Sequence, residues 1–320
     1  MTWPPPYPYD RLNELKSLGE KFAGGLVDLS IGRPSDAPPD AVVAALSTSG
    51  QERGYPPSIG SAALRAAATG WLRRRFDIAI EPSQVAACIG TKEFVAALPG
   101  LLHLRTPERD TVLYPEVSYP SYAMGARLAR LRSVAVPVDA HWRLDLSRID
   151  PADAERALCL WVNTPGNPAG GLDDLGAVAE WGRSRNVPIF SDECYIEFTW
   201  DGPPRSVLQH GVDGVVALHS LSKRSNLAGV RAGFYAGDPE LVHYISECRK
   251  HTGMMPPGPN QHAAIVAFGD DAHVDEQRLR YLERLNRLVE ILGHLDIAAQ
   301  LPAGAFYLWV SAPDGDGWAL

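Results

Sequence analysis

The sequence predicts an α/β protein whose large domain has three layers, with a mostly parallel β-sheet between two layers of helices. Short apolar runs of strand length recur along the middle of the chain, at 85–89, 111–114, 133–138, 157–162, 187–190, 215–218 and 232–235. Segments with helical spacing of apolar residues precede, separate or follow them, at 62–75, 91–102, 121–130, 172–185 and 239–249. Strands that alternate with helices favour a parallel sheet that is covered on both faces.

The two ends of the chain depart from this alternation. The prolines at positions 4, 5, 6 and 8 prevent regular structure at the start, before one short helix at 9–19. After a loop rich in proline and glycine at 254–260, we expect helices, including a long one at 274–295, and a strand at 306–310. This tail predicts a smaller α/β domain. Because the chain stops soon after that strand, we expect this domain to be incomplete at its C-terminus.

These patterns divide the chain of 320 residues into three parts. They are an N-terminal arm with a small-domain segment (1–40), the large domain (41–252) and the C-terminal small domain (253–320).

Composition excludes several classes of partner. The net charge of -8 argues against nucleic acid or an anionic membrane surface. No apolar run is long enough to cross a bilayer, and the start lacks the apolar stretch of a secretory signal, so we expect a cytoplasmic protein. The four cysteines are far apart, which favours reduced thiols. The histidines are scattered and no His-Glu-x-x-His occurs, so we expect no metal site.

The most informative stretch is Ser220-Leu221-Ser222-Lys223, which follows the apolar run at 215–218 and precedes Arg231 by a short loop. A lysine amine can condense with an aldehyde, and two hydroxyls with an arginine can hold a phosphate. This combination suggests a lysine-bound pyridoxal 5'-phosphate (PLP). The alternative is an exposed basic turn after a buried strand. The chain has only five lysines, at positions 16, 21, 92, 223 and 250.

Other strand ends carry groups that could complete such a site, because ligands of open α/β sheets bind beyond the carboxyl ends of the strands. Gly90, Thr91 and Lys92 begin a predicted helix, whose free N–H groups and dipole could seat a phosphate, although a plain helix cap at Thr91 is the commoner alternative for a lone Gly-Thr. Tyr119 could present its ring to a flat heterocycle, or it could be a packing aromatic.

The next two strands end in an amide and a carboxylate. Asn167 lies in a proline-containing turn that would hold its side chain toward the strand ends, or the turn could be an ordinary one. Asp192 could keep a pyridine nitrogen protonated, which makes the ring an electron sink, and the Tyr195 hydroxyl could meet the 3'-oxygen of the ring. For Asp192 the alternative is a helix cap.

Taken together in this order, the segments resemble the class I/II aminotransferases, which are fold-type I PLP enzymes. The matching segments cover most of the chain, at 29–32, 55–65, 90–93, 118–120, 163–168, 191–195 and 220–231. As an ordered set they are specific, whereas any one alone is weak.

The resemblance implies a role for each residue. Lys223 would bind PLP covalently and then move the proton between the substrate carbon and the cofactor, while Asp192 would pair with the ring nitrogen. Tyr195 and Asn167 would contact the ring oxygen, and Tyr119 would stack on the ring. The phosphate would be surrounded by Gly90, Thr91, Lys92, Ser220, Ser222 and Arg231.

The resemblance also implies contacts beyond the cofactor. Tyr55 would reach the phosphate of the neighbouring subunit, so that a homodimer would share its two sites. Gly32 and Asn167 would meet the substrate carboxylate, and Arg33 is a candidate contact for a distal carboxylate, although a surface or arm contact is the alternative for Arg33. The family's main carboxylate-binding arginine lies near the C-terminus of its members, and this sequence ends before a match to it.

Three stretches, at 220–229, 249–255 and 269–274, are similar to actinobacterial succinyldiaminopimelate transaminases of lysine biosynthesis. That similarity implies transfer of the amino group of glutamate to N-succinyl-2-amino-6-oxopimelate, with amino acids and 2-oxo acids as the small-molecule substrates. The alternatives are another amino-acid aminotransferase, a C–S lyase of the same fold, or a truncated, non-catalytic remnant that binds PLP.

Overall fold

The computed structural model describes residues 7–312 and 315–317. The chain divides into two compact units at Arg33–Pro34, and each is described by itself. The N-terminal unit contains a 3-10 turn (Pro8–Arg11) followed by α1 (Leu12–Gly19), within the span predicted for a helix. Lys16 Nζ of α1 forms an ion pair with Oδ2 of Asp28, farther along this unit, at 2.8 Å.

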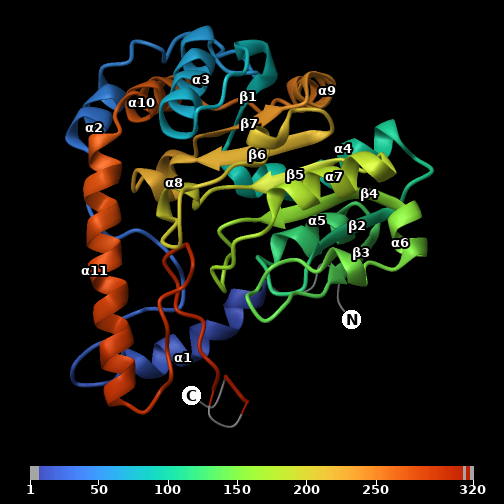
Figure 1. Ribbon diagram of the computed structural model, residues 1–320. Coiled ribbons are helices and arrows are strands. Elements are labelled where there is room, and N and C mark those ends of the chain that lie inside the picture. The colour runs from blue at the N-terminus through green and yellow to red at the C-terminus, as the bar shows by residue number, and fades with distance from the viewer. Residues whose placement is uncertain (1–6, 313–314, 318–320) are drawn as a thin grey trace. The chain divides into compact units, whose positions relative to one another are not determined.

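The second unit is built on one mostly parallel sheet, as the sequence predicted (Figure 1). The strand order is β1-β7-β6-β5-β4-β2-β3, and β7 is antiparallel to both of its neighbours while the other pairs are parallel. The strands are β1 (Val85–Cys88), β2 (Thr111–Pro115), β3 (Arg132–Val136), β4 (Ala157–Asn163), β5 (Ile189–Asp192), β6 (Val215–Ser220) and β7 (Gly233–Gly237).

The sheet separates two hydrophobic cores, because successive side chains of a strand point to opposite faces. In β1, Val85 and Ala87 belong to one core while Ala86 and Cys88 belong to the other. Strands that are buried on both faces read as continuous apolar runs, which explains why the sequence identified them.

Helices cover both faces of the sheet. Buried residues of one core come from α2 (Asp40–Ser47), α3 (Ala62–Phe76), α6 (Pro151–Glu155), α7 (Leu175–Arg185), α8 (Leu221–Arg224) and α10 (Gly258–Gly269). Those of the other core come from α4 (Thr91–Arg105), α5 (Ser121–Leu128) and α9 (Pro239–His251). The predicted three-layer arrangement of the large domain is therefore confirmed. The long α11 (Ala272–His294) extends away from the sheet (Figure 1).

Local signals place several helix ends. Asp238 caps α9 by accepting from the N–H groups of Glu240 and Leu241, and Pro239 occupies the first helical position, where no N–H partner is needed. At the other end of a helix, Asn186 follows α7 in the left-handed conformation with φ 51°.

Two sequence predictions about the tail are wrong. The segment expected to be a strand at 306–310 forms no strand, and only an isolated bridge joins Thr199 and Gly304 just before it. The side chains of Phe306 and Tyr307 pack on an aromatic cluster formed by Tyr195, Phe198 and Tyr281. Their apolar character therefore reflects packing on this cluster and not pairing in a β-ladder. The loop expected at 254–260 is shorter, because α10 already begins at Gly258, where Pro259 suits the first helical turn.

No helix within residues 7–312 and 315–317 has both the length and the apolar character needed to span a membrane.

Candidate active site

The carboxyl ends of three neighbouring parallel strands meet at one edge of the sheet. Asn163 at the end of β4 pairs in register with Asp192 at the end of β5, and Asp192 pairs with Leu218 near the end of β6. Helix α8 begins directly after β6 and carries Lys223. The predicted lysine and aspartate therefore lie at the same edge, where ligands of open α/β sheets bind.

Asp192 is a buried carboxyl that is 7% exposed. Its Oδ2 accepts a hydrogen bond from the Tyr122 hydroxyl at 3.0 Å, and its Oδ1 accepts from the Cys194 N–H at 3.3 Å. Burial raises the pKa of Asp192, while these two hydrogen bonds act in the opposite direction. A cationic partner would stabilise the carboxylate in this environment, and a protonated ring nitrogen supplies one.

Lys223 carries an amine suited to covalent chemistry. Burial lowers the pKa of its amine, which increases the fraction present as the neutral nucleophile. Its Nζ lies 5.7 Å from the centroid of the Phe306 ring, so an aromatic side chain packs beside the amine.

The residues predicted to hold a phosphate converge next to Lys223. The Ser220 hydroxyl donates to Ser222 Oγ at 2.9 Å, and Arg231 Nη1 donates to the same Ser222 Oγ at 3.4 Å. Arg231 also lies so close to Gly90 that a Cβ at this glycine, whose φ is 70°, would collide with the guanidinium. Gly90 gives the first N–H groups of α4 no side-chain cap, and Arg231 lies beside this start of the helix. The donor set fits a phosphate dianion.

The turn after β4 is fastened to the strand ends. The Asn163 side chain donates to the carbonyl of Asp192 at 2.9 Å and accepts from the N–H of Asn167 at 2.8 Å. Asn167 Nδ2 in turn donates to the Tyr195 hydroxyl at 3.4 Å. The two residues predicted to share one oxygen of a bound ring therefore lie side by side.

Tyr119, Lys92 and Thr91 also lie at this edge. The Tyr119 ring lies 6.3 Å from that of Tyr122, which bonds Asp192, and Lys92 Nζ lies 5.8 Å from the Tyr119 ring centroid. Thr91 Oγ1 is 3.2 Å from Cys194 Sγ, and the position before the helix belongs to Gly90, so Thr91 is not the helix cap.

Three predicted contacts stay predictions. Tyr55 is 97% exposed, so its side chain is accessible to another molecule. Gly32 and Arg33 belong to the N-terminal unit.

Two tyrosines of the site were missed at the level of sequence. Tyr122 lies on α5, three residues after Tyr119, and its contact with Asp192 depends on how α5 packs against the sheet. The Tyr307 hydroxyl lies 2.6 Å from the Tyr195 hydroxyl, although the surrounding segment was expected to be a strand. A glycine followed by two adjacent aromatics, Gly304 to Tyr307, was the only available signal.

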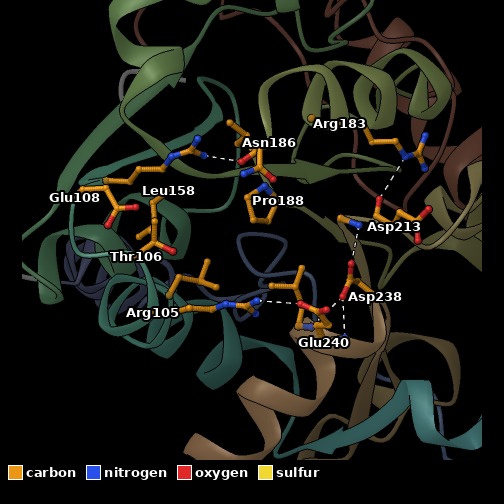
Figure 2. Close-up of a pocket in the computed structure, with 16 residues that line it drawn as sticks. Arg105, Thr106, Glu108, Leu158, Arg183, Asn186, Pro188, Asp213, Asp238 and Glu240 are labelled. Carbon is orange, nitrogen blue, oxygen red and sulfur yellow. Dashed lines mark hydrogen bonds and ion pairs between the residues drawn. The ribbon is translucent and has the colours of Figure 1, made fainter.

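A separate cavity of about 420 Å³ lies at the opposite, amino edge of the sheet and is shown in Figure 2. Its lining includes Leu158 near the start of β4 and Pro188 just before β5, and none of the predicted site residues. Its arginines are engaged by the chain itself, since Arg105 pairs with Glu240 at 3.2 Å and Arg183 donates to the Asp213 carbonyl at 3.3 Å. We therefore place the active site at the carboxyl edge. The described part of the chain contains no group of three or more His, Cys, Asp or Glu side chains arranged to hold a metal ion.

The fold and the groups gathered at the carboxyl edge fit an enzyme that binds a phosphorylated, ring-shaped aldehyde. The family model "Aminotransferase class I and II" matches residues 25–315, and the chain belongs to this family. Its members depend on PLP, so the protein is a PLP-dependent transaminase.

Three curated relatives illustrate the range of the family. The chain is 40% identical over 315 residues to the 4-dedimethylamino-4-oxo-anhydrotetracycline transaminase OxyQ of Streptomyces rimosus, covering 96% of this chain and 84% of that protein. It is 41% identical to the "Probable aminotransferase Rv1178" of Mycobacterium tuberculosis, with 96% and 73% covered. It is 32% identical to the LL-diaminopimelate aminotransferase of Aquifex aeolicus, with 97% and 83% covered.

Solved structures agree on the fold. An aminotransferase from Neisseria meningitidis superposes with a TM-score of 0.91 at 30% identity, covering 98% of this chain and 84% of that one. The "probable N-succinyldiaminopimelate aminotransferase" of Thermus thermophilus superposes with a TM-score of 0.87 at 29% identity, covering 96% and 85%.

Proposed function

We propose that this transaminase transfers the amino group of glutamate to N-succinyl-2-amino-6-oxopimelate, yielding N-succinyl-L,L-diaminopimelate and 2-oxoglutarate, a step of lysine biosynthesis. The observation that carries the proposal is the likeness, over nearly the whole chain, to relatives named for diaminopimelate-type substrates. The stretches at 249–255 and 269–274 add support from the chain itself.

Those two stretches act through the scaffold of the site. Arg249, which is 2% exposed, donates to both carboxylate oxygens of Glu93, at 2.6 and 2.9 Å, and Glu93 accepts from the Ile89 N–H at 2.8 Å. This pair holds the backbone just before Gly90. Asp271 accepts a hydrogen bond at 3.0 Å from Arg224, the residue after Lys223. We therefore infer that these stretches contribute to the proposed substrate specificity by shaping the cofactor site and not by contacting the substrate.

In this proposal the described side chains divide the work. PLP, when bound, supplies an electron sink for the amino-acid α-carbon. Lys223 would hold the cofactor covalently and would carry the proton at its Nζ, and Asp192 would keep the ring nitrogen protonated. Tyr195 and Asn167 would orient the ring through its oxygen, and Tyr119 would cover one ring face.

The phosphate would be held by the donors around α8 and by the N-terminus of α4, namely Gly90, Thr91, Lys92, Ser220, Ser222 and Arg231. Charge-assisted hydrogen bonds to a dianion are the strong kind, so this part of the site fixes the position of the cofactor.

The proposal extends to assembly and place. The enzyme works in the cytoplasm as a homodimer, in which the exposed Tyr55 reaches the site of the neighbouring subunit. Gly32 and Asn167 meet the α-carboxylate, Arg33 meets a distal one, and 41–252 forms the PLP-binding domain between the arm (1–40) and the small domain (253–320).

A substrate panel tests this function. The purified holoenzyme is given 2-oxoglutarate with N-succinyl-L,L-diaminopimelate, with L,L-diaminopimelate and with a set of common amino acids, and kcat/KM is measured for each. We expect the succinylated donor to have the highest value. A higher value for unmodified L,L-diaminopimelate, or for a common amino acid, would contradict the proposed specificity while leaving the transaminase assignment intact.

A second candidate rests on the 40% identity to OxyQ, whose name describes a polycyclic ketone as the amino acceptor. Including a 4-oxo-anhydrotetracycline in the panel, with glutamate as the donor, decides between the two candidates.

A further inference from the structure

The segment from Gly304 to Tyr307 is fastened against two parts of the active site. The Gly304 N–H donates to the Gly170 carbonyl at 3.0 Å, close to the turn that carries Asn167. A Cβ at Gly304 would lie 2.5 Å from Pro165 Cβ of the same turn, so only glycine allows this approach. The Ala305 N–H donates at 2.9 Å to the carbonyl of Phe198, and the two contacts together hold the segment in place.

This anchoring places two aromatic side chains against the residues that carry the chemistry. The Phe306 ring lies 5.7 Å from Lys223 Nζ and 5.3 Å from the Tyr195 ring. The Tyr307 hydroxyl lies 2.6 Å from the Tyr195 hydroxyl, a short hydrogen bond between two phenols. The segment therefore contacts both the lysine and the tyrosine of the site.

The hydrogen-bonding capacity of a phenol limits the directions that these bonds can take, and either hydroxyl of the Tyr195–Tyr307 pair can be the donor. A phenol has one proton to donate and lone pairs that accept. The Tyr195 oxygen already accepts from Asn167 Nδ2 at 3.4 Å. If it also accepts from Tyr307, its own proton remains available for an oxygen of a bound ligand. Burial raises the pKa of Tyr195, so Tyr195 keeps its proton and can act as a donor.

We propose that Tyr307 is a positioning residue of this active site, which donates a hydrogen bond to the Tyr195 hydroxyl and thereby strengthens Tyr195 as a donor to the ring oxygen of the cofactor. Hydrogen bonds in a chain polarise one another, so a phenol that accepts a bond is a better donor. The inference rests on the proposed role of Tyr195, and it adds a residue from a segment distant in sequence.

The consequence concerns the charge on the ring oxygen. A donor to that oxygen stabilises its anionic form, which lowers the pH at which the visible absorption band of the lysine-bound cofactor titrates. Removing the Tyr307 hydroxyl should raise this midpoint slightly, because Tyr195 would still donate but more weakly. Removing the Tyr195 hydroxyl should raise it further.

The test is a pH titration of the absorption band in holoenzymes carrying Tyr307→Phe, Tyr195→Phe or both, with the dissociation constant of PLP measured from the fluorescence of the apoenzymes. We expect Tyr307→Phe to raise the midpoint by about 0.3 pH unit. The double variant should match Tyr195→Phe alone, since Tyr307 acts through Tyr195. The matched control is Tyr281→Phe, which lies in the same aromatic cluster and whose hydroxyl bonds Asn226 at 3.1 Å.

An unchanged midpoint in Tyr307→Phe would overturn the inference, and so would a shift that persists undiminished on the Tyr195→Phe background. Failure of the proposed substrate specificity is distinguishable, because a different preferred amino donor would leave these titrations unaltered. A midpoint that Tyr195→Phe itself does not move would instead overturn both the role of Tyr195 and that of Tyr307.

Discussion

At the carboxyl edge of the sheet, charged residues that are adjacent in sequence lie on opposite faces and make different contacts. Asp192 bonds Tyr122 on the face covered by α4 and α5, whereas Glu193 is fully buried on the other face, with an oxygen 3.6 Å from His219 Nε2. On α8, Lys223 lies beside Phe306 near the site, whereas the next residue, Arg224, is buried among α3, α10 and the start of α11.

Two buried carboxylates, Glu197 on the face covered by α3 and α10 (the structural face) and Asp192 on the face covered by α4 and α5 (the site face), differ in how fully the protein satisfies them. On the structural face, the Glu197 carboxylate accepts from Trp71 at 2.9 Å, from Arg75 at 2.8 Å and from Arg224 at 3.3 Å. These bonds use the capacity of the carboxylate within the protein. On the site face, Asp192 accepts from Tyr122 and a backbone N–H, which leaves capacity for a ligand. Burial of a charged group therefore does not by itself mark a candidate site. What distinguishes Asp192 is that its carboxylate keeps hydrogen-bonding capacity at the edge of the sheet that also carries Lys223.

The largest expected effect is a loss of activity without a loss of stability, from a substitution on the site face. Lys223→Ala should lower kcat by at least about 10³-fold, because it removes both the nucleophile and the proton carrier. Stability should change little. Steady-state kinetics with glutamate, with Lys250→Ala as the control because this lysine pairs with Glu247 on the surface, checks this. Residual activity near that of the control would show that another group carries the chemistry.

The structural face should respond in stability instead. Glu197→Gln should reduce the free energy of unfolding by about 3 kcal/mol, because it breaks a buried ion pair and leaves the guanidinium groups of Arg75 and Arg224 with one carboxylate fewer. Glu276→Gln, which breaks a surface pair with Arg280, should change it by less than about 1 kcal/mol. Urea unfolding measures both, and equal effects of the two substitutions would contradict the distinction between buried and surface pairs.

The buried pair of Glu193 and His219 predicts a specific pH dependence. Burial raises the pKa of Glu193 to about 7 and lowers that of His219 to about 3. Between the unfolded and folded pKa of Glu193, about 4.3 to 7, the native state holds an extra proton, so this group's contribution to stability is lost as pH rises. His219 acts in the opposite direction, since its contribution is lost as pH falls from about 6.5 toward 3.

The two slopes therefore offset each other where their windows overlap. In Glu193→Gln only the His219 slope remains, so the free energy of unfolding should rise more steeply with pH than in the wild type between about pH 4.5 and 6.5. Urea unfolding of both proteins across this range measures the difference. Parallel curves would mean that Glu193 is ionised in the native protein.

The smallest expected effect is a change in PLP affinity when Asp192 loses one of its two hydrogen bonds. Tyr122→Phe removes one hydrogen bond to Asp192 but keeps the ring, so it should weaken PLP binding by about 1 kcal/mol, roughly fivefold. Fluorescence titration of the apoenzyme measures this. Tyr244→Phe is the control, because its hydroxyl donates to the Leu101 carbonyl at 2.7 Å, away from the site. Equal affinities of the two variants would show that Tyr122 does not support Asp192.

Patterns within short stretches predicted most of the fold and part of the site. An apolar run such as β4 is recognisable in the sequence alone. Because β4 and β5 are parallel, the polar residues at their ends, Asn163 and Asp192, lie at the same edge of the sheet. Tyr307 and Tyr122 could not be found in this way, because their hydroxyls meet partners across 112 and 70 positions of sequence. Such contacts depend on how helices and loops pack, which local periodicity does not encode.

The covalent attachment of PLP to Lys223 can be tested directly. The holoenzyme is reduced with borohydride, digested, and its peptides are weighed by mass spectrometry. We expect the mass of the reduced cofactor on the peptide that contains Lys223, in a chain with only five lysines. The same mass on a peptide containing Lys92 or Lys250 instead, or no modified peptide at all, would contradict the assignment of the active site.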